Sequence, residues 1–279
     1  MSTTACDGFA AVCVPLAIAA GEKIMQAYGS ASVGIATKAD ASPVTEADAL
    51  AEEIILAGLR DAFPDIPVVA EEEVAAGRVP TTSERFFLVD PLDGTKEFIS
   101  RNGEFTVNIA LVEKGKPVAG VVYAPALGDI YIGSPEGALR SRVKDGICVD
   151  WVPIQCRPAP AVLTAVGSRS HGTQETARFL ERYDVGSFVS RGSSLKFCLV
   201  AAGEADIYPR LGRTMEWDTA AGDAVLRAAG GLVTDLEGRS MIYNKRNQSH
   251  DSDFANGSFV AYGDQALPRA ADAPRTGVA

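Results

Sequence analysis

The stretch Phe86-Phe87-Leu88-Val89-Asp90-Pro91-Leu92-Asp93-Gly94-Thr95 organises the rest of this chain. Its four leading apolar residues predict a short buried strand. Pro91 predicts the end of that strand, because proline has no N–H group for a strand ladder. Gly94 permits a tight bend, and residues 95–99 have the composition of one helical turn, whose free N–H groups would face an anion. Two carboxylates beside such a helix end make chemical sense if cations lie between them.

Two other acidic motifs flank this stretch. Glu71 and Glu72 precede it, and Trp217-Asp218-Thr219-Ala220-Ala221-Gly222 follows it. In this order the three motifs resemble the signatures of the inositol monophosphatase-like, lithium-sensitive, magnesium-dependent phosphatases. Two further stretches are similar to the 3′(2′),5′-bisphosphate nucleotidase branch of that family: Gly167-Ser168-Arg169-Ser170-His171, and Gly192-Ser193-Ser194-Leu195-Lys196-Phe197-Cys198 running on to Tyr208-Pro209-Arg210. The resemblance covers nearly the whole chain.

Hydrophobic periodicity and turn residues divide the chain into expected elements. A segment with three prolines, residues 151–160, is the candidate boundary, and strand–helix alternation after it indicates an α/β unit. We expect loops over residues 29–41 and 74–84, helices over 7–28, 45–63, 173–183, 193–203 and 218–229, and strands over 66–70, 105–112, 118–123, 129–132, 138–139, 161–166, 205–208, 232–234 and 259–261.

The resemblance implies a layered αβαβα sandwich of the sugar-phosphatase type, with mixed α+β and α/β character. Residues 1–156 would form an α+β half with an antiparallel sheet and most metal ligands. Residues 157–268 would form an α/β half that contacts the nucleotide, and residues 269–279 would be a loose tail. Because Asp218 comes from the second half, the site would lie between the two halves.

The composition restricts partners and compartment. A formal charge of −10 disfavours a nucleic-acid polymer but is compatible with small phosphate esters if metal ions invert the local charge. Five cysteines without a Cys-x-x-Cys pattern favour reduced thiols in a cytoplasm, and two histidines argue against a histidine-based zinc site. The apolar run of residues 9–20 is too short to span a bilayer, so we interpret it as part of a core helix. We expect a cytoplasmic monomer or homodimer with no transmembrane segment, and leave open a loose association with the inner face of the membrane.

Divalent cations would neutralise the phosphate and activate the attacking water. Mg²⁺ prefers hard oxygen ligands, and the resemblance implies two or three Mg²⁺ ions per site. The implied ligands are Glu71, Asp90, the backbone carbonyl of Leu92, Asp93 and Asp218. For Asp218 the alternative is a simple helix N-cap, since aspartate favours that position.

The resemblance also assigns catalytic roles to Thr95, Asp48 and Glu71. Thr95 would assist the metal-bound water, and Asp48 would orient that water or a third metal. For Asp48 a capping box with Thr45 is the alternative.

The implied substrate carries a 3′-phosphate, a 5′-phosphate and an adenine. Lysine and arginine suit the remote 5′-phosphate, which arginine can hold with two hydrogen bonds. The alternative is that Ser193 caps its helix and Lys196 is a solvated surface lysine. The implied substrate-binding residues are Glu71, Leu92, Asp93, Gly94, Thr95, His171, Ser193, Lys196, Arg210 and Asp218.

The resulting hypothesis is a Mg²⁺-dependent phosphatase that removes the 3′-phosphate of adenosine 3′,5′-bisphosphate to give AMP, and that also accepts the sulfated form. A close alternative is an inositol monophosphate or fructose 1,6-bisphosphate phosphatase with the same metals. An alternative of another class is a non-catalytic nucleotide-binding regulator. A haloacid-dehalogenase phosphatase is disfavoured, because its Asp-x-Asp loop has one residue between the aspartates, whereas this chain has two.

Overall fold

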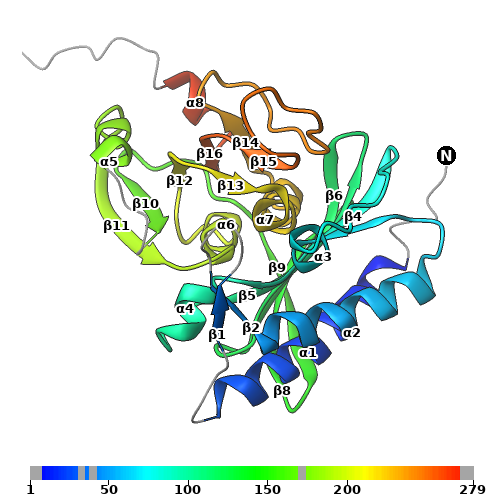
Figure 1. The fold of residues 1–279 in the computed structure, drawn as a ribbon. Helices are drawn as coiled ribbons and strands as arrows, with labels where there is room; N and C mark the ends of the chain where they lie inside the picture. Colours follow the sequence, from blue (N-terminus) through cyan, green and yellow to red (C-terminus); the bar gives the residue numbers. More distant parts are fainter. Residues whose placement is uncertain (1–7, 31–34, 38–42, 169–173, 271–279) are drawn as a thin grey trace, which may run out of the picture.

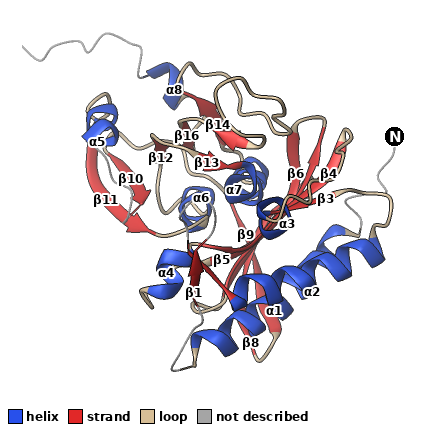
Figure 2. Cartoon of the chain, viewed as in Figure 1, coloured by secondary structure: helices blue, strands red, loops and turns tan. Residues whose placement is uncertain are grey.

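The computed structural model describes residues 8–30, 35–37, 43–168 and 174–270, with residues 35–37, 43–45 and 269–270 described by their backbone alone. A large sheet of seven strands in sequence order forms its centre (Figures 1 and 2). Only β3 and β4 are parallel within it. The strands are β3 (Val68–Ala70), β4 (Arg85–Asp93), β5 (Thr106–Glu113), β6 (Lys116–Ala124), β7 (Asp129–Ser134), β8 (Gly137–Lys144) and β9 (Ile147–Ile154).

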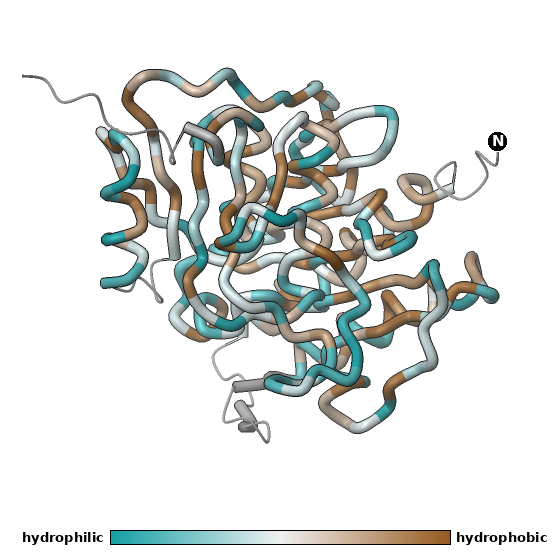
Figure 3. The backbone as a smooth tube through the Cα atoms, turned by 90° about the horizontal axis from the view of Figure 1, so that it is seen from above, coloured by the Kyte–Doolittle hydropathy of each residue, from teal (hydrophilic) through white to brown (hydrophobic). Residues whose placement is uncertain are grey.

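Strand alternation gives this sheet two apolar faces. Phe87 and Val89 pack with the helices α1 (Phe9–Tyr28) and α2 (Glu46–Ala62), which run side by side in Figure 1. Phe86 and Leu88 point the other way and pack with α6 (Leu195–Ala201) and α7 (Glu216–Ala228). Figure 3 shows hydrophobic segments in the interior of the molecule and hydrophilic segments in many of its outer loops. The sheet is therefore covered by helices on both faces.

Two glycines allow α7 to approach the sheet closely. A Cβ atom on Gly120 would stand 2.6 Å from the carbonyl oxygen of Ala221, and one on Gly133 would stand 2.5 Å from the Cα of Val225. Any larger residue at either position would push α7 outward. The position of α7 matters because it carries Asp218 in its first turn.

A second sheet lies beyond α6 and α7, with the strand order β11-β10-β12-β16-β14. Its strands are β10 (Leu163–Ser168), β11 (Val185–Arg191), β12 (Ile207–Arg210), β14 (Leu232–Asp235) and β16 (Phe259–Tyr262). The helices α5 (Gln174–Leu180) and α8 (Leu267–Ala270) lie at its outer side (Figure 1), where Leu180 and Leu267 join its apolar cluster. Together the elements form the expected αβαβα sandwich. The remaining elements are α3 (Glu71–Ala75), α4 (Thr95–Ile99), β1 (Ile35–Thr37) paired with β2 (Pro43–Thr45), and β13 (Thr214–Met215) paired with β15 (Ala255–Asn256).

The N-terminal helix α1 is long and apolar enough to cross a membrane by length and composition, and no other helix of the described residues passes that test. In this structure Phe9, Ala17 and Ile24 of α1 are buried in the core beneath the large sheet. The interpretation of this segment as a core helix therefore fits its packing.

The structure corrects several expected elements. The strand does not end at Asp90, because β4 continues to Asp93 with a register shift between the two aspartates. Pro91 lies within that irregularity, where no ladder N–H is required. Residues 74–75 complete α3 rather than starting a loop, and β1 lies within the expected loop of residues 29–41.

Six strands of the described residues were not predicted: the short strands β1, β2, β13 and β15, and the longer edge strands β9 and β11. The candidate boundary of residues 151–160 begins inside β9, an edge strand that pairs Pro153 with Leu139. An edge position tolerates proline, and this is why proline content misled the prediction. The strand β11 is also an edge strand, and its half-exposed residues lack the apolar alternation of a covered strand. Because α6 and α7 follow the boundary yet pack on the first sheet, the division at residue 156 stays a prediction.

Candidate active site

Asp90 and Asp93 lie where β4 loses its register with β5. Asp90 pairs with Asn108 and Asp93 pairs with Thr106. The two residues between the aspartates on β4 therefore lie opposite a single residue of β5 and form a bulge. The Asp90 side chain is 1% exposed, and its Oδ1 accepts a hydrogen bond from the N–H of Leu92 at 3.0 Å. The bulge changes the direction of the chain at the end of the sheet, and both carboxylates lie at this end.

Glu71 and Asp218 reach the same place from two helices. Glu71 is the first residue of α3, directly after β3, and Asp218 lies in the first turn of α7. Burial, followed by the charges of Glu71, Asp93 and Asp218, raises the pKa of Asp90 well above its usual value, and Glu71 also shares a hydrogen bond with Asp90. Burial, followed by the charges of Asp93 and Glu71, likewise raises the pKa of Asp218. Four acidic groups from both halves of the chain therefore form one repulsive cluster.

Asp218 is not the N-cap of α7, as the simple alternative supposed. The N-cap is Met215, and Asp218 is the third helical residue. Its Oδ2 reaches back to accept the Met215 N–H at 2.8 Å, which is the second half of a capping box. The bond uses one carboxylate oxygen and fixes the side chain at the helix start.

The acid cluster suits a hard divalent cation. Carboxylates are the ligands that Mg²⁺ accepts most readily, and a cation would relieve the mutual repulsion. Among the described residues, no group of three His, Cys, Asp or Glu side chains is already arranged to hold a metal ion. N–H groups hold Oδ1 of Asp90, Oδ2 of Asp93 and Oδ2 of Asp218, so one oxygen of each of these carboxylates already has a partner.

A cavity of about 270 Å³ opens beside these acids. Its walls come from both halves of the chain, and it contains acidic, cationic and hydroxyl groups together. Among the expected substrate residues, Leu92 is buried and does not line the cavity, and His171 lies outside the described residues. The lining residues are Glu71, Asp93, Gly94, Thr95, Lys96, Glu97, Ser168, Ser193, Lys196, Phe197, Tyr208, Arg210, Thr214, Asp218 and Thr219.

Gly94 and Thr95 shape the floor of the cavity. Gly94 has φ = 91°, a conformation that favours glycine, and a Cβ atom there would stand 2.9 Å from Oγ of Ser193. Thr95 begins α4, and its Oγ1 lies 3.5 Å from Oδ1 of Asp48 and 3.4 Å from the carbonyl oxygen of Leu92. Asp48 is buried in the first turn of α2, so it supports Thr95 from behind. The side chain of Thr45 lies outside the description, so the proposed capping box stays a prediction.

Residues 191–194 clamp the second half of the chain onto Asp93. The Ser194 N–H donates to Oδ2 of Asp93 at 2.8 Å, and Oγ of Ser193 donates to the Asp93 carbonyl at 2.5 Å. Oγ of Ser194 also donates to the carbonyl of Asp218 at 2.8 Å. Ser193 has φ = 55°, and Ser194 rather than Ser193 is the N-cap residue of α6. The idea that Ser193 only caps its helix is therefore wrong.

Lys196 is a buried residue, contrary to the surface-lysine alternative. Its side chain is 5% exposed, and burial lowers its pKa to about 8. The Nζ donates to the carbonyls of Ser193 at 2.5 Å and Arg191 at 3.4 Å, so it holds the clamp as well as lining the cavity. Arg210 differs, because its Nε is buried with no hydrogen-bond partner among the described residues. Arg210 therefore has one guanidinium donor that no described residue accepts.

Three polar residues near the site were not identified from the sequence. Asn108 donates to Oδ2 of Asp93 at 3.3 Å, and Thr106 lies 3.5 Å from the same oxygen. Both sit on one face of β5, so two polar residues at a spacing of two within an apolar strand could have marked them. Glu104 accepts the Gly192 N–H at 2.9 Å and so anchors the clamp.

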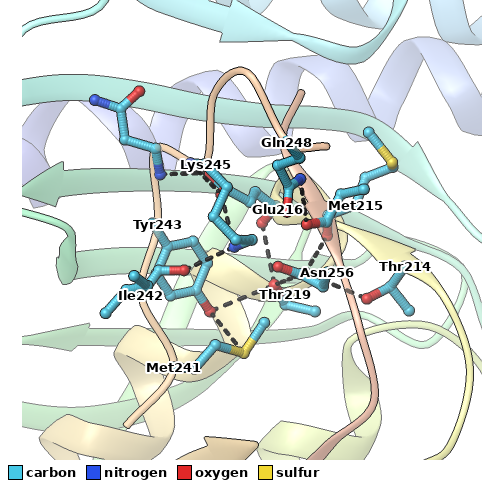
Figure 4. Close-up of polar contacts among 12 residues, drawn as sticks. Thr214, Met215, Glu216, Thr219, Met241, Ile242, Tyr243, Lys245, Gln248 and Asn256 are labelled. Atoms are coloured by element: carbon cyan, nitrogen blue, oxygen red, sulfur yellow. Dashed lines mark hydrogen bonds and ion pairs between the residues drawn. The ribbon is translucent and has the colours of Figure 1, made fainter. Parts of the chain in front are cut away.

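A polar network stabilises the start of α7 behind Asp218 (Figure 4). Glu216 is fully buried, pairs with Nζ of Lys245 at 2.7 Å, and accepts the N–H groups of Asn244 and Lys245. Asn256 bridges the Met215 carbonyl and the Thr219 hydroxyl. The first turn of α7 is thus tied to the segment that leads into β15.

Comparisons with known proteins agree with this arrangement. The sequence model described as the inositol monophosphatase family matches residues 7–262. The 3′(2′),5′-bisphosphate nucleotidase CysQ of Salmonella typhimurium is 50% identical over 232 residues, which cover 83% of this chain and 92% of that protein. The crystal structure of CysQ from Bacteroides thetaiotaomicron has a TM-score of 0.75 and 38% identity, over 91% of this chain and 96% of that one. The inositol monophosphatase TM1415 of Thermotoga maritima has a TM-score of 0.73 and 25% identity, over 93% of each chain.

Proposed function

The chain belongs to the inositol monophosphatase family, and within it we propose that the protein is a 3′(2′),5′-bisphosphate nucleotidase, a metal-dependent phosphatase. It removes the 3′-phosphate of adenosine 3′,5′-bisphosphate to give AMP and inorganic phosphate, and it also accepts the sulfated nucleotide. The observation that carries the proposal is the buried cluster of four acids that borders a cavity containing Arg210 and Lys196. The identity of about half to nucleotidase relatives over most of their length supports it.

In this proposal Glu71, Asp90, the Leu92 carbonyl, Asp93 and Asp218 would hold two or three Mg²⁺ ions. The bound ions would supply positive charge to the phosphoryl oxygens and lower the pKa of a water molecule. Supporting the assignment, the acids are hard oxygen donors, and burial together with their mutual repulsion raises the pKa of Asp90 and Asp218 well above the usual value.

The remaining groups would bind and orient the reactants. Thr95 Oγ1, positioned between Asp48 and the Leu92 carbonyl, would accept a hydrogen bond from the attacking water and relay its proton to the Asp48 carboxylate. That water would attack phosphorus as the bond to the 3′-oxygen breaks, and the 3′-oxygen would take a proton from solvent water and leave as a hydroxyl. The N–H groups of the Gly94–Thr95 turn would face the phosphate. Arg210, which lines the cavity, would hold the 5′-phosphate through its guanidinium group.

We propose that the protein acts on small molecules in the cytoplasm as a monomer or homodimer. The formal charge of −10 supports small phosphate esters over nucleic-acid polymers. Sedimentation velocity at micromolar concentration distinguishes the two assembly states.

The deciding experiment measures phosphate release from adenosine 3′,5′-bisphosphate, its sulfated form, inositol 1-phosphate and fructose 1,6-bisphosphate, each with Mg²⁺ and with a chelator. We expect Mg²⁺-dependent release with a strong preference for the adenine nucleotides. Asp90→Asn should abolish release and keep the fold, whereas Asp65→Asn, at an exposed site on a loop, should change nothing. A preference for inositol or sugar phosphate would retain the metal site and reject the nucleotide assignment. Nucleotide binding without any release would indicate a regulator.

A further inference from the structure

Glu52 is a buried carboxylate that the proposed reaction does not use. It lies on α2 with 4% of its surface exposed. Its Oε2 accepts the N–H of Glu72 at 2.8 Å, and its Oε1 accepts the N–H of Glu73 at 2.9 Å. Both carboxylate oxygens of Glu52 therefore accept hydrogen bonds from the first turn of α3.

That first turn has no cap of its own. The N-cap of α3 is Ala70, which has an extended backbone and no side-chain oxygen to offer. The unmet N–H groups of a helix start need acceptors, and Glu52 supplies two from another helix. Because Ala70 is also the last residue of β3, paired with Val89, the segment is held on both sides of Glu71.

This arrangement is costly for stability. Glu52 is placed beside a turn that already carries Glu71, Glu72 and Glu73. Burial, opposed by the two backbone hydrogen bonds and reinforced by the charges of Glu72 and Glu73, raises the pKa of Glu52 to about 7. A neutral polar side chain would satisfy one N–H without that repulsion. The hydrogen bonds to both oxygens of Glu52 fix the orientation of the first turn of α3.

A second buried acid on the same helix acts in parallel. Asp48 stands four residues before Glu52, so the two side chains lie on one face of α2, one turn apart. Asp48 contacts Thr95 at the start of α4, and Glu52 contacts the start of α3. One rigid helix thus sets the spacing between the two short helices that carry Glu71 and Thr95.

We propose that Glu52 is a positioning residue for the cation site: by fixing the first turn of α3, it aims the Glu71 carboxylate at Asp90. It acts through Glu71 and touches neither substrate nor metal. This inference rests on the proposed function insofar as Glu71 is a metal ligand. Groups that orient metal ligands typically change metal affinity about 10- to 100-fold when they are removed.

The test compares Glu52→Ala and Glu52→Gln with Glu53→Ala, which removes the same charge from the neighbouring exposed position of α2. Mg²⁺ binding is measured by calorimetry on the full chain without substrate, and melting temperatures are measured with a chelator. Kinetics then give kcat and the Mg²⁺ concentration for half-maximal rate. We expect Glu52→Ala to weaken Mg²⁺ binding about 10- to 100-fold and Glu52→Gln to weaken it less, since glutamine keeps one acceptor. High Mg²⁺ should restore much of kcat, and Glu53→Ala should match the wild type.

A lower melting temperature with unchanged Mg²⁺ affinity in both Glu52 variants would reduce the residue to a structural role and overturn the proposal. If Glu52→Ala does not fold, Glu52→Gln decides alone. Failure of the nucleotidase assignment is separable, because a wild-type protein that binds Mg²⁺ but releases no phosphate would still show the affinity loss in the variants.

Discussion

Gly192 offers the sharpest test of how the two halves of the chain form one site. Gly192 is one of the clamp residues 191–194, and a Cβ atom at this position would stand 2.4 Å from the Glu104 carbonyl oxygen and 2.8 Å from Cγ of Glu97. Backbone cannot yield as a flexible side chain can, so Gly192→Ala must push the segment away from Glu104. Its φ is not in the left-handed region, so the effect is steric and not a loss of backbone freedom.

The magnitude follows from the hydrogen bonds that this shift would break. The Gly192 N–H donates to the Glu104 carboxylate at 2.9 Å, and the Ser194 N–H donates to the Asp93 carboxylate at 2.8 Å. A hydrogen bond to a charged group contributes about 1.5–3 kcal/mol. Losing the Asp93 contact alone should lower kcat/KM by about 10- to 150-fold, at 1.36 kcal/mol for each factor of ten.

The assay is kcat/KM for adenosine 3′,5′-bisphosphate at saturating Mg²⁺, with circular dichroism to confirm folding. Gly257→Ala is the matched control, because a Cβ atom there meets nothing within 4 Å. Full activity of Gly192→Ala, with a wild-type KM, would refute the idea that this segment holds Asp93 in place.

Three other perturbations address separate parts of the structure. Arg210→Ala should raise KM for adenosine 3′,5′-bisphosphate by about 10- to 100-fold while leaving KM for adenosine 3′-phosphate nearly unchanged, because only the former offers a 5′-phosphate. Equal effects on both substrates would show that Arg210 does not bind the 5′-phosphate. Burial lowers the pKa of Lys196 to about 8 from 10.5. Between pH 8 and 10.5 the unfolded chain therefore holds more protons than the folded chain, so the free energy of unfolding of the wild type should rise over this range relative to Lys196→Met. Parallel urea-unfolding profiles of the two proteins would contradict this. Glu216→Ala leaves Lys245 without its buried partner and should lower the free energy of unfolding by about 3–5 kcal/mol, measured by urea denaturation, whereas a loss below about 1 kcal/mol would show that water replaces the pair.

The acidic motifs could be read from the chain because their chemistry is local. Asp90, Asp93 and Gly94 lie within five residues, and two acids followed by a glycine bend are visible in the sequence. The helices at residues 46–62 and 216–228 were also predicted within two residues at each end, because capping residues and apolar periodicity mark helix ends locally. The layered sandwich, which the family resemblance implied, is confirmed by the structure.

The burial of Lys196 and the contacts of Ser193 could not be predicted from the residues next to them in the sequence. Nothing within a few residues of Lys196 distinguishes a surface lysine from a buried one. Its burial follows from the packing of α6 between the two sheets, with Tyr208 beneath its Nζ at 5.4 Å from the ring centre. Likewise, the contact of Ser194 with Asp93 joins residues 101 positions apart.

The sequence by itself determined the residue types of the site and the order of the motifs, because these depend on neighbours along the chain, and the resemblance that those motifs carry implied the layered fold. Only the tertiary structure decided which oxygens face one another, that Asp218 is the third residue of α7 and not its N-cap, and that Glu52 supports α3 from α2. Those contacts depend on the register of β4 against β5 and on the close approach of α7 to Gly120 and Gly133. Register and helix distance are set by packing across the whole core, and no short window of sequence contains them.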